Sequence, residues 1–324
     1  MTEPLTPATI AARSSELAPR LGLPVTPLTR FGAFSDELGA EVLVKCEHQQ
    51  RTGSFKARGG MAKALTLTPE QRERGVVTAS TGNHGLGVGN ALATLGGRAI
   101  VFVPENASES KVAALRRFGV EIRAQGMDTG VLESLARKYA DENCMAYVSP
   151  YNDPDVIAGQ GTIGVEILTQ LEDRPLDAIV VAVGGGGLVC GVASVLKQHL
   201  PGITVYGASP AADAAMAASV AAGRIVAVDA KQTLSDGTAG SVEDGSVTFE
   251  LCRALVDDWV LVGEDEIRAA LRTVIDTEHQ LVEGSAAMAF AAARARAAGL
   301  AGKRVAIVSC GANISARTLA AALA

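Results

Sequence analysis

The sequence predicts an α/β protein with open, twisted, mostly parallel sheets flanked by helices. Short runs of β-branched residues alternate with longer alanine-rich segments of helical period, a pattern typical of that class. Glycine-bearing loops follow several of the predicted strands and precede predicted helices. The chain has 324 residues, more than one hydrophobic core usually organises, so we expect two domains.

The predicted elements fall into two series along the chain. After a strand at 41–47, a compact βαβαβ unit is expected over about residues 75–125, with strands at 75–80, 98–104 and 119–125 and helices at 85–96 and 109–119. The second series has helices at 161–171, 187–200 and 285–299 and strands at 177–183, 204–209, 258–263 and 304–310. We therefore expect a small domain at 67–148, inserted in a large domain made of 1–66 and 149–324.

Composition and charge exclude several classes of protein. Hydrophobic residues make up 48% of the chain and charged residues 20%, enough apolar material for a sizeable core. The net charge of -6 is scattered, and no basic stripe with aromatic residues suggests nucleic acid as a partner. The first residues do not resemble a signal peptide, and four glycines interrupt the longest apolar stretch, 178–196, so we expect no membrane segment.

The cysteines and the end of the chain add two expectations. Five cysteines occur without a CxxC pair or metal-ligand spacing, which argues against a disulfide framework and fits a reducing cytoplasm. The chain ends just after a short predicted helix, so we expect no added regulatory domain.

Three loops that join a predicted strand to a predicted helix carry the chemistry: STGNHG (80–85), VGGGGL (183–188) and SCGAN (309–313). In open parallel sheets, ligands bind at the carboxyl ends of the strands, where helix N-termini direct N-H groups at anions. The four glycines at 184–187 allow close backbone approach to a phosphate, or make a packing turn. The loop at 80–85 can bind a carboxylate, or simply cap a helix.

Lys56 can be interpreted in two ways, as an ordinary solvated residue or as a reactive one. Most lysines are solvated, and Lys56 near the start of a predicted helix fits that description. A lysine in a partly desolvated cleft has a depressed pKa and can form a Schiff base with a carbonyl compound. Pyridoxal 5'-phosphate would explain both the lysine and the tetraglycine loop, because this aldehyde cofactor also carries a phosphate.

These segments resemble, in their order along the chain, the motifs of the fold-type II pyridoxal phosphate enzymes, the group of threonine and serine dehydratases and serine racemases. The matching segments are SFKARGG (54–60), STGNHG, AGQGT (158–162), VGGGGL and SCGAN, with PVTPLTRF (24–31), TLSDGTAG (233–240) and LVEGSAAM (281–288) similar to further segments of that family. The resemblance covers the chain from about Pro24 and implies a tryptophan synthase β-like fold, pyridoxal 5'-phosphate as cofactor and a homodimer.

The resemblance also implies a role for individual residues. Lys56 would form the Schiff base, with Phe55 near the ring and Asn83 bonded to the 3'-oxygen of the cofactor. The phosphate would be held by the backbone N-H groups of Gly184, Gly185, Gly186, Gly187 and Leu188. The substrate carboxylate would be received by Ser80, Thr81, Asn83 and His84. Cys310 would face the pyridine nitrogen.

A thiol at Cys310 favours elimination over transamination, because it need not keep the pyridine nitrogen protonated, as an aspartate would. We therefore expect α,β-elimination of water from a 3-hydroxy amino acid, which yields a 2-oxo acid and ammonia. Lys56 takes the α-proton, and the β-hydroxyl leaves with a proton from the phosphate or a nearby acid. Lys56 and Thr81 are the expected catalytic residues.

Some positions depart from the family pattern. Thr81 replaces the serine that is the opposite-face acid in racemases, and its extra methyl and stiffer χ1 disfavour racemisation. Ser209 and Ala215 stand where metal-activated relatives carry carboxylates, which leaves only Asp213 nearby, so we expect no metal ion and no magnesium dependence. Leu132 stands approximately where relatives that act on hydroxyaspartate carry an arginine. Together with Tyr151 it indicates an apolar or aromatic β-substituent, or it is an ordinary core residue of an amphipathic helix.

The candidate substrates are threonine, serine and phenylserine, with a slight preference for phenylserine. Serine or aspartate racemase and hydroxyectoine-utilisation dehydratase are the alternatives among enzymes. Outside catalysis, a silent pyridoxal phosphate carrier or a nucleotide-binding regulator stays open.

Overall fold

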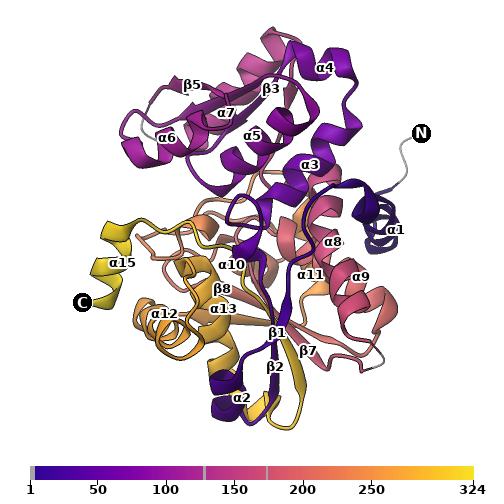
Figure 1. The fold of residues 1–324 in the computed structure, drawn as a ribbon, viewed down its shortest axis with the longest axis vertical. Helices are drawn as coiled ribbons and strands as arrows, with labels where there is room; N and C mark the ends of the chain where they lie inside the picture. The colour runs from indigo at the N-terminus through magenta and orange to yellow at the C-terminus, as the bar shows by residue number, and fades with distance from the viewer. Residues whose placement is uncertain (1–3, 127–128, 173) are drawn as a thin grey trace.

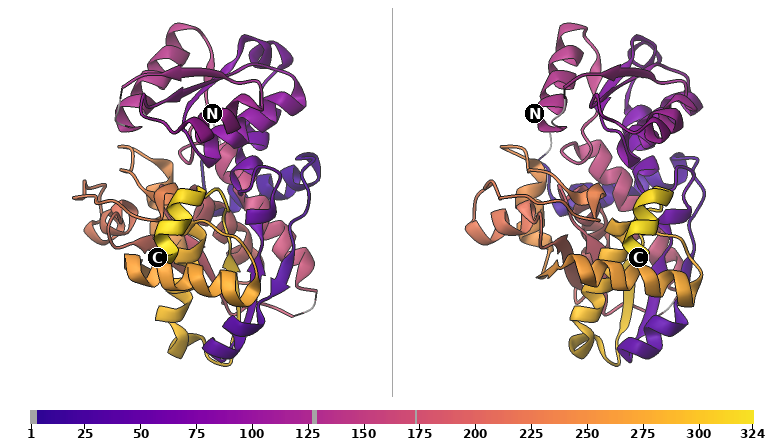
Figure 2. Two further views of the ribbon diagram at one scale, coloured as in Figure 1. Left: turned by 60° about the vertical axis from the view of Figure 1, so that its left-hand side comes forward. Right: turned by 90° about the vertical axis from the view of Figure 1, so that its left-hand side faces the viewer.

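The computed structural model describes residues 4–126, 129–172 and 174–324, and it contains two β-sheets, each flanked by helices. Figure 1 shows the smaller sheet and its helices above the larger sheet, and the two units keep that arrangement in both views of Figure 2. The predicted α/β fold with mostly parallel sheets is confirmed.

The larger sheet has six strands in the order β1-β2-β10-β7-β8-β9. Only β1 runs antiparallel, to β2, and the other neighbours are parallel. The strands are β1 (Leu28–Arg30), β2 (Glu41–Lys45), β7 (Ala178–Ala182), β8 (Thr204–Pro210), β9 (Asp258–Val262) and β10 (Arg304–Val308). Parallel strands place their carboxyl ends at one edge of the sheet, so the loops after β7 and β10 lie near each other.

Helices cover both faces of this sheet. On one face α1 (Pro7–Leu17), α8 (Pro154–Gln170), α9 (Gly187–His199) and α11 (Val247–Leu255) pack together. On the other face α13 (Gly284–Ala295) contacts β7 to β10, and α12 (Glu264–Glu278) packs against α13 (Figure 1). The remaining elements of this unit are α2 (Gly32–Leu38), α10 (Ala215–Ala222), α14 (Ala297–Leu300), α15 (Ala316–Leu323) and the short 3-10 helices η1 (Ala18–Arg20), η2 (Glu47–Gln49) and η3 (Asp236–Thr238).

The smaller sheet has four parallel strands in the order β5-β4-β3-β6. They are β3 (Val76–Ala79), β4 (Ala99–Val103), β5 (Glu121–Ala124) and β6 (Ala146–Tyr147). The associated helices are α3 (Lys56–Thr66), α4 (Pro69–Arg74), α5 (Asn83–Leu95), α6 (Glu109–Arg116) and α7 (Thr129–Glu142). Because α3 contacts both α5 and α8, it joins the two units.

All the strands expected from the sequence are present within a few residues. Strand β1 lies in the segment 24–31 that resembles the family, and β6 was not predicted, because two residues carry too little pattern. Helix α8 begins at Pro154, well before the predicted start at 161, because the Asp153 side chain caps it by accepting hydrogen bonds from the N-H groups of Asp155 and Val156 at 2.8 and 3.2 Å. The predicted helix 285–299 is divided into α13 and α14 at Arg296, which pairs with Asp258 at 2.6 Å.

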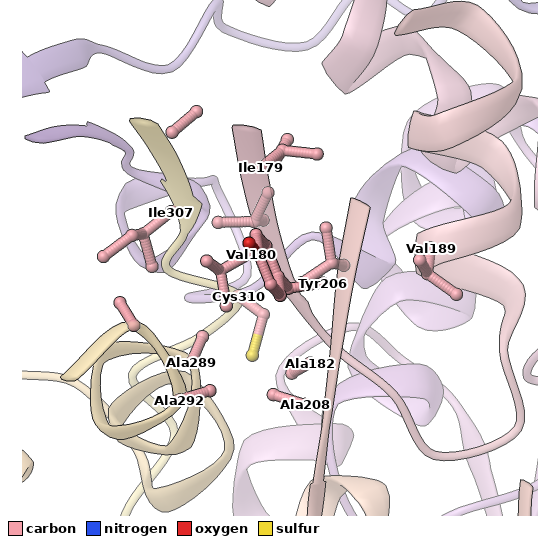
Figure 3. Packing of buried hydrophobic residues seen from close by; sticks show 14 of the residues in the cluster. Ile179, Val180, Ala182, Val189, Tyr206, Ala208, Ala289, Ala292, Ile307 and Cys310 are labelled. Atoms are coloured by element: carbon pink, nitrogen blue, oxygen red, sulfur yellow. The ribbon is translucent and has the colours of Figure 1, made fainter. Parts of the chain in front are cut away.

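The main hydrophobic core lies between the larger sheet and its two helical layers. Figure 3 shows Ile179, Val180 and Ile307 of the strands together with Ala289 and Ala292 of α13. The small alanine side chains let α13 lie close to the sheet. Within the part of the chain that the structure describes, no helix is long and apolar enough to cross a membrane.

Candidate active site

A cavity of about 480 Å³ lies at the carboxyl ends of the strands of both sheets. It is lined by every site residue predicted from the sequence: Phe55, Lys56, Ser80, Thr81, Asn83, His84, Gly184, Gly185, Gly186, Gly187, Leu188 and Cys310. We name its two sides by their origin. The large-sheet wall comprises Lys56, the loop 184–188 and Cys310, and the small-sheet wall comprises the loop 80–84 and the face of α7 that carries Leu132 and Glu133.

Lys56 is the first residue of α3 and is tied to the larger sheet. The segment before it pairs with the loop after β10, through a bridge between Ser54 and Gly311 and a hydrogen bond from the Phe55 N-H to the Cys310 carbonyl at 3.1 Å. Its Nζ donates to the carbonyl of Pro150 at 2.7 Å. Burial lowers the pKa of Lys56 to about 8, so a minor but larger than usual fraction of the amine is uncharged near neutral pH.

Helix α3 is held by close backbone contact with α5. A side chain at Gly60 would lie 2.6 Å from the carbonyl of Gly87, and a side chain at Gly87 would lie 2.5 Å from the Lys56 carbonyl oxygen. Only glycine permits this crossing distance. The position of Lys56 is therefore set by the packing of two helices whose Gly60 and Gly87 are far apart in the sequence.

A buried charge cluster fixes α3 on its other side. The Arg58 guanidinium pairs with Glu47 at 2.8 Å and with Glu166 at 2.6 Å, and Lys45 pairs with Glu166 at 2.6 Å. The carboxylates hold the pKa of Arg58 above its usual range in spite of burial, whereas burial lowers the pKa of Lys45. Because each buried charge has a partner, the cluster locks β2, η2, α3 and α8 together two residues from Lys56.

The tetraglycine loop between β7 and α9 forms a narrow backbone cradle. Gly186 has φ of 88°, a conformation that favours glycine. A side chain at Gly184 would lie 2.6 Å from the Thr238 carbonyl oxygen, and one at Gly185 would lie 2.4 Å from the ring of Tyr151. No acceptor among the described residues bonds the backbone N-H groups of 184–188, so these donors at the start of α9 are free for an anion.

The loop after β3 carries the other predicted anion donors. Ser80 Oγ accepts a hydrogen bond from the Gly82 N-H at 3.2 Å, which shapes the turn into α5. His84 Nε2 lies 3.0 Å from the Val148 carbonyl oxygen, so the proton of the ring is on Nε2. Burial, followed by the charge of Lys56, lowers the pKa of His84 to about 3. His84 is therefore a neutral, hydrogen-bonded side chain and not a cation for a carboxylate.

Cys310 lies two residues after the end of β10, within the buried apolar cluster and among the small side chains in Figure 3. Burial raises the pKa of the Cys310 thiol well above its usual range. The group at this position is a neutral thiol, which neither carries a negative charge nor favours a positive charge beside it.

Sequence reasoning missed a hydrogen-bonded network around Asn83. Its Nδ2 donates to Glu283 Oε1 at 2.9 Å, and its Oδ1 accepts from Asn313 Nδ2 at 2.6 Å. The N-H of Asn313 donates to Glu283 Oε2 at 3.0 Å, yet burial raises the pKa of Glu283 to about 7. The signal was present, since Glu283 and Asn313 lie in LVEGSAAM and SCGAN, but nothing local singles them out from their neighbours.

Further lining residues come from α7, in the small-sheet wall, and from the segment after β6. Leu132 is buried and contacts the core beneath the smaller sheet, and Tyr151 packs against the tetraglycine loop; both also line the cavity. Glu133, the next residue of α7, lines the cavity as well, and burial raises its pKa to about 7. The sequence pointed to Leu132 and Tyr151 in the cleft but not to Glu133.

Ser209 at the end of β8 and Asp213 in the loop after it, near the positions of carboxylates in metal-activated relatives, are hydrogen-bonded within the protein. Ser209 Oγ donates to the Val183 carbonyl at 2.9 Å, and Asp213 Oδ2 accepts from the Gly240 N-H at 2.7 Å. Among the residues that the structure describes, no group of three or more His, Cys, Asp or Glu side chains gathers as metal ligands.

The cavity fits pyridoxal 5'-phosphate on three observations of its own. The cradle at 184–188 has room for a phosphate only because it lacks side chains, and its N-H groups are free. Lys56 offers a partly uncharged amine for the aldehyde, and a neutral thiol at Cys310 suits an unprotonated ring nitrogen. All three lie on the large-sheet wall.

Comparisons with known proteins agree with this fit. A family profile described as "Pyridoxal-phosphate dependent enzyme" matches residues 20–311. The chain is 37% identical to a putative threonine dehydratase of Sinorhizobium fredii over 290 residues, which is 89% of this chain and 87% of the relative. It is 40% identical to the catabolic L-threonine dehydratase TdcB of Escherichia coli over 267 residues, 82% of this chain and 80% of the relative.

The fold also matches solved structures. The processed form of threonine deaminase isoform 2 from Solanum lycopersicum superimposes with a TM-score of 0.92 at 33% identity, covering 97% of this chain and 91% of that chain. Relatives with these names support a dehydratase that uses pyridoxal phosphate. On its sequence, its fold and the composition of its cavity, the chain belongs to the family of pyridoxal-phosphate dependent enzymes.

Proposed function

We propose that the protein eliminates water from a small 3-hydroxy amino acid to release a 2-oxo acid and ammonia. The observation that carries this proposal is a single cavity that combines a lysine with a depressed pKa and a side-chain-free phosphate cradle. Threonine and serine are the first substrates to test, in agreement with the names of the relatives, and phenylserine is the larger candidate.

In this proposal the chain's own residues divide the work between the two walls. Lys56 and Phe55, Asn83, Cys310 and the N-H groups of 184–188 hold the cofactor, which supplies an electron sink for the α-carbon when bound. Ser80, Thr81 and Asn83 orient the α-carboxylate of the substrate, and His84, whose ring proton is donated to Val148, contributes only its backbone N-H. The Lys56 amine then removes the α-proton at Nζ, since its lowered pKa leaves it partly unprotonated at neutral pH.

Glu283 acts here as a positioning residue. It holds Asn83 in place from the opposite unit, while Asn313 fixes the other end of the same amide. The orientation of Asn83 toward the cofactor therefore depends on three segments that are far apart in the sequence. The uncharged Cys310 supports elimination, because a less protonated ring favours early departure of a β-leaving group.

The test is a panel of 3-hydroxy amino acids, including both threonine and phenylserine, assayed for ammonia and 2-oxo acid with the parent and with Lys56→Ala. We expect release from at least one member, and a loss of roughly 10³-fold or more in the variant, because the nucleophile and base is removed. Undiminished turnover by Lys56→Ala would contradict the role of Lys56 as nucleophile and base. Chiral analysis of the recovered substrate separates dehydration from racemisation, which the hydroxyl retained at Thr81 leaves chemically accessible.

We also propose the location, assembly, partners and domain boundaries of the enzyme. It acts as a cytoplasmic homodimer on a free amino acid, without nucleic acid, a membrane or a divalent metal ion, and residues 67–148 form a small domain within the large domain of 1–66 and 149–324. Support for the domains comes from the four-stranded sheet, whose strands all lie between Val76 and Tyr147. Light scattering tests the dimer, and full activity in a chelator tests metal independence.

A further inference from the structure

Three carboxyl groups line the cavity, and two of them are occupied by other residues. Glu283 is bonded to Asn83 and Asn313, and Asp236 pairs with Lys111 at 3.3 Å. Glu133 is the third, and no hydrogen bond or ion pair to its carboxyl is found among the described residues. The function proposed above has assigned Glu133 no task.

The groups that face Glu133 come from several elements. Arg137 lies one turn further along α7, Tyr147 is on β6, Lys56 is on α3, and Tyr151 and Glu243 lie in loops. Arg137 is committed elsewhere, since it pairs with Glu243 at 3.0 Å and lies over the Tyr147 ring at 4.3 Å. Burial and then the charge of Glu243 raise the pKa of Glu133 to about 7, so the protonated carboxyl is well populated at neutral pH and predominates below it.

The other sides of the cavity have other occupants in the proposed function. The cradle at 184–188 takes the phosphate, the loop 80–84 takes the α-carboxylate, and Lys56 takes the α-proton. The side left for the β-substituent is that of Leu132, Glu133 and Tyr151. Leu132 is apolar, and the hydroxyl of Tyr151 accepts a hydrogen bond from the Glu243 N-H at 2.9 Å while burial raises its pKa.

From this placement we propose that Glu133 is the acid that protonates the departing β-hydroxyl group. This inference rests on the proposed function and identifies the residue that assists the leaving group. It makes Glu133 a catalytic residue, and it explains why a carboxyl without a partner lines the cavity on the side of the β-substituent.

The step balances with groups already in the site. The Cα-H bond breaks and its proton goes to Lys56 Nζ, while the electron pair forms the new Cα-Cβ double bond. The Cβ-O bond breaks with its electron pair on oxygen, which accepts the Glu133 proton and leaves as water. Glu133 ends as a carboxylate and Lys56 as an ammonium group, and proton exchange with water restores both.

The test compares two leaving groups in Glu133→Gln and in the matched control Glu142→Gln, which makes the same change at an exposed position of α7. Hydroxide needs a proton to leave, whereas the chloride of β-chloroalanine does not. General acid catalysis contributes about 10²- to 10⁴-fold, so we expect E133Q to lose at least about 10²-fold in kcat with the hydroxy substrate and only a few-fold with β-chloroalanine. Exchange of the α-proton with deuterated water should persist in E133Q, and E142Q should match the parent.

Two pH measurements complete the test. The kcat/KM of the parent with the hydroxy substrate should fall as pH rises above about 7, since the protonated carboxyl is the active form, and E133Q should lack that limb. In the cofactor-free chain labelled with ¹³C at glutamate carboxyls, the resonance that E133Q removes should titrate near pH 7. A resonance that is already fully ionised at pH 6 contradicts the proposal.

The outcomes separate the two proposals. If the parent releases no 2-oxo acid from any 3-hydroxy amino acid, the proposed function fails and this inference fails with it. If the parent is active but E133Q loses both substrates equally, Glu133 has a positioning role and is not the acid. If E133Q loses neither substrate, Glu133 has no role in the reaction.

Discussion

The two walls of the cavity are built in different ways. The large-sheet wall rests on a continuous core and on the cluster of Arg58, Glu47 and Glu166, where Arg58 and Glu47 are buried and every charge has a partner. The small-sheet wall rests on smaller clusters. Of its ion pairs to the other unit, Lys111 with Asp236 is exposed and Arg137 with Glu243 is partly exposed. The residues assigned to the cofactor therefore lie mainly on the large-sheet wall. Most of those assigned to the substrate lie on the small-sheet wall, which is more weakly held.

The largest effect is expected for Arg58→Met in the large-sheet wall. It removes the only guanidinium of the buried cluster and leaves the charges of Glu47 and Glu166 with less compensation, so we expect a loss of about 3 to 5 kcal/mol in unfolding free energy. Urea unfolding measures the change, with exposed Arg253→Met as the control. Equal stability of the two variants would show that the cluster does not anchor the wall.

Glu283→Gln probes the contact that joins the two walls. The pKa of Glu283 in the fold is about 7, above its ordinary value of 4.5, so its contribution to stability is full below pH 4.5 and is lost as pH rises through 7. The parent should therefore lose up to about 3 kcal/mol between pH 4.5 and 8.5 that the glutamine variant does not lose. Unfolding curves at several pH values, with Glu142→Gln beside them, decide this; parallel pH profiles of variant and parent would contradict it.

Gly185→Ala tests whether the cradle tolerates any side chain. Its Cβ would lie 2.4 Å from the Tyr151 ring, and relief of that overlap should lower stability by about 1 to 3 kcal/mol and weaken cofactor binding. The control is Gly202→Ala, where nothing lies within 4 Å of the added carbon. Titration with pyridoxal phosphate and thermal unfolding give both readouts, and the prediction is wrong if the two alanine variants behave alike.

The smallest effect is expected at the small-sheet wall. Lys111→Ala removes an ion pair whose side chains are 40% and 62% exposed, so its coupling to Asp236 should be below about 1 kcal/mol and should shrink with added salt. A double-mutant cycle with Asp236→Asn measures this coupling. A coupling well above that value would mean that ion pairs hold the small-sheet wall as strongly as the large-sheet wall.

Much of the site could be read from local patterns. Lys56 follows a Gly-Ser-Phe segment, and the loops 80–85, 183–188 and 309–313 each join a strand to a helix or to the segment that leads to one. Parallel strands share the direction of their carboxyl ends, so the loops after β7 and β10 could be expected at one edge of a sheet. The loop 80–85 follows β3 of the smaller sheet, and only the packing of the two units brings it to the same cavity. Helix α8 shows the limit, since Asp153 and Pro154 form a cap that a periodicity argument does not register.

The strands, helices and glycine loops follow from the amino-acid sequence, since these depend on neighbours within a few residues. Only the packing of the chain decides which ionisable side chains are charged and which polar side chains are already hydrogen-bonded to another residue. Asn83 meets Glu283 across 200 positions, and the pKa values of Lys56, Glu133 and Glu283 follow from burial by distant segments. The physical reason is that desolvation and hydrogen bonding depend on the surroundings in space, and only the packed chain defines those surroundings.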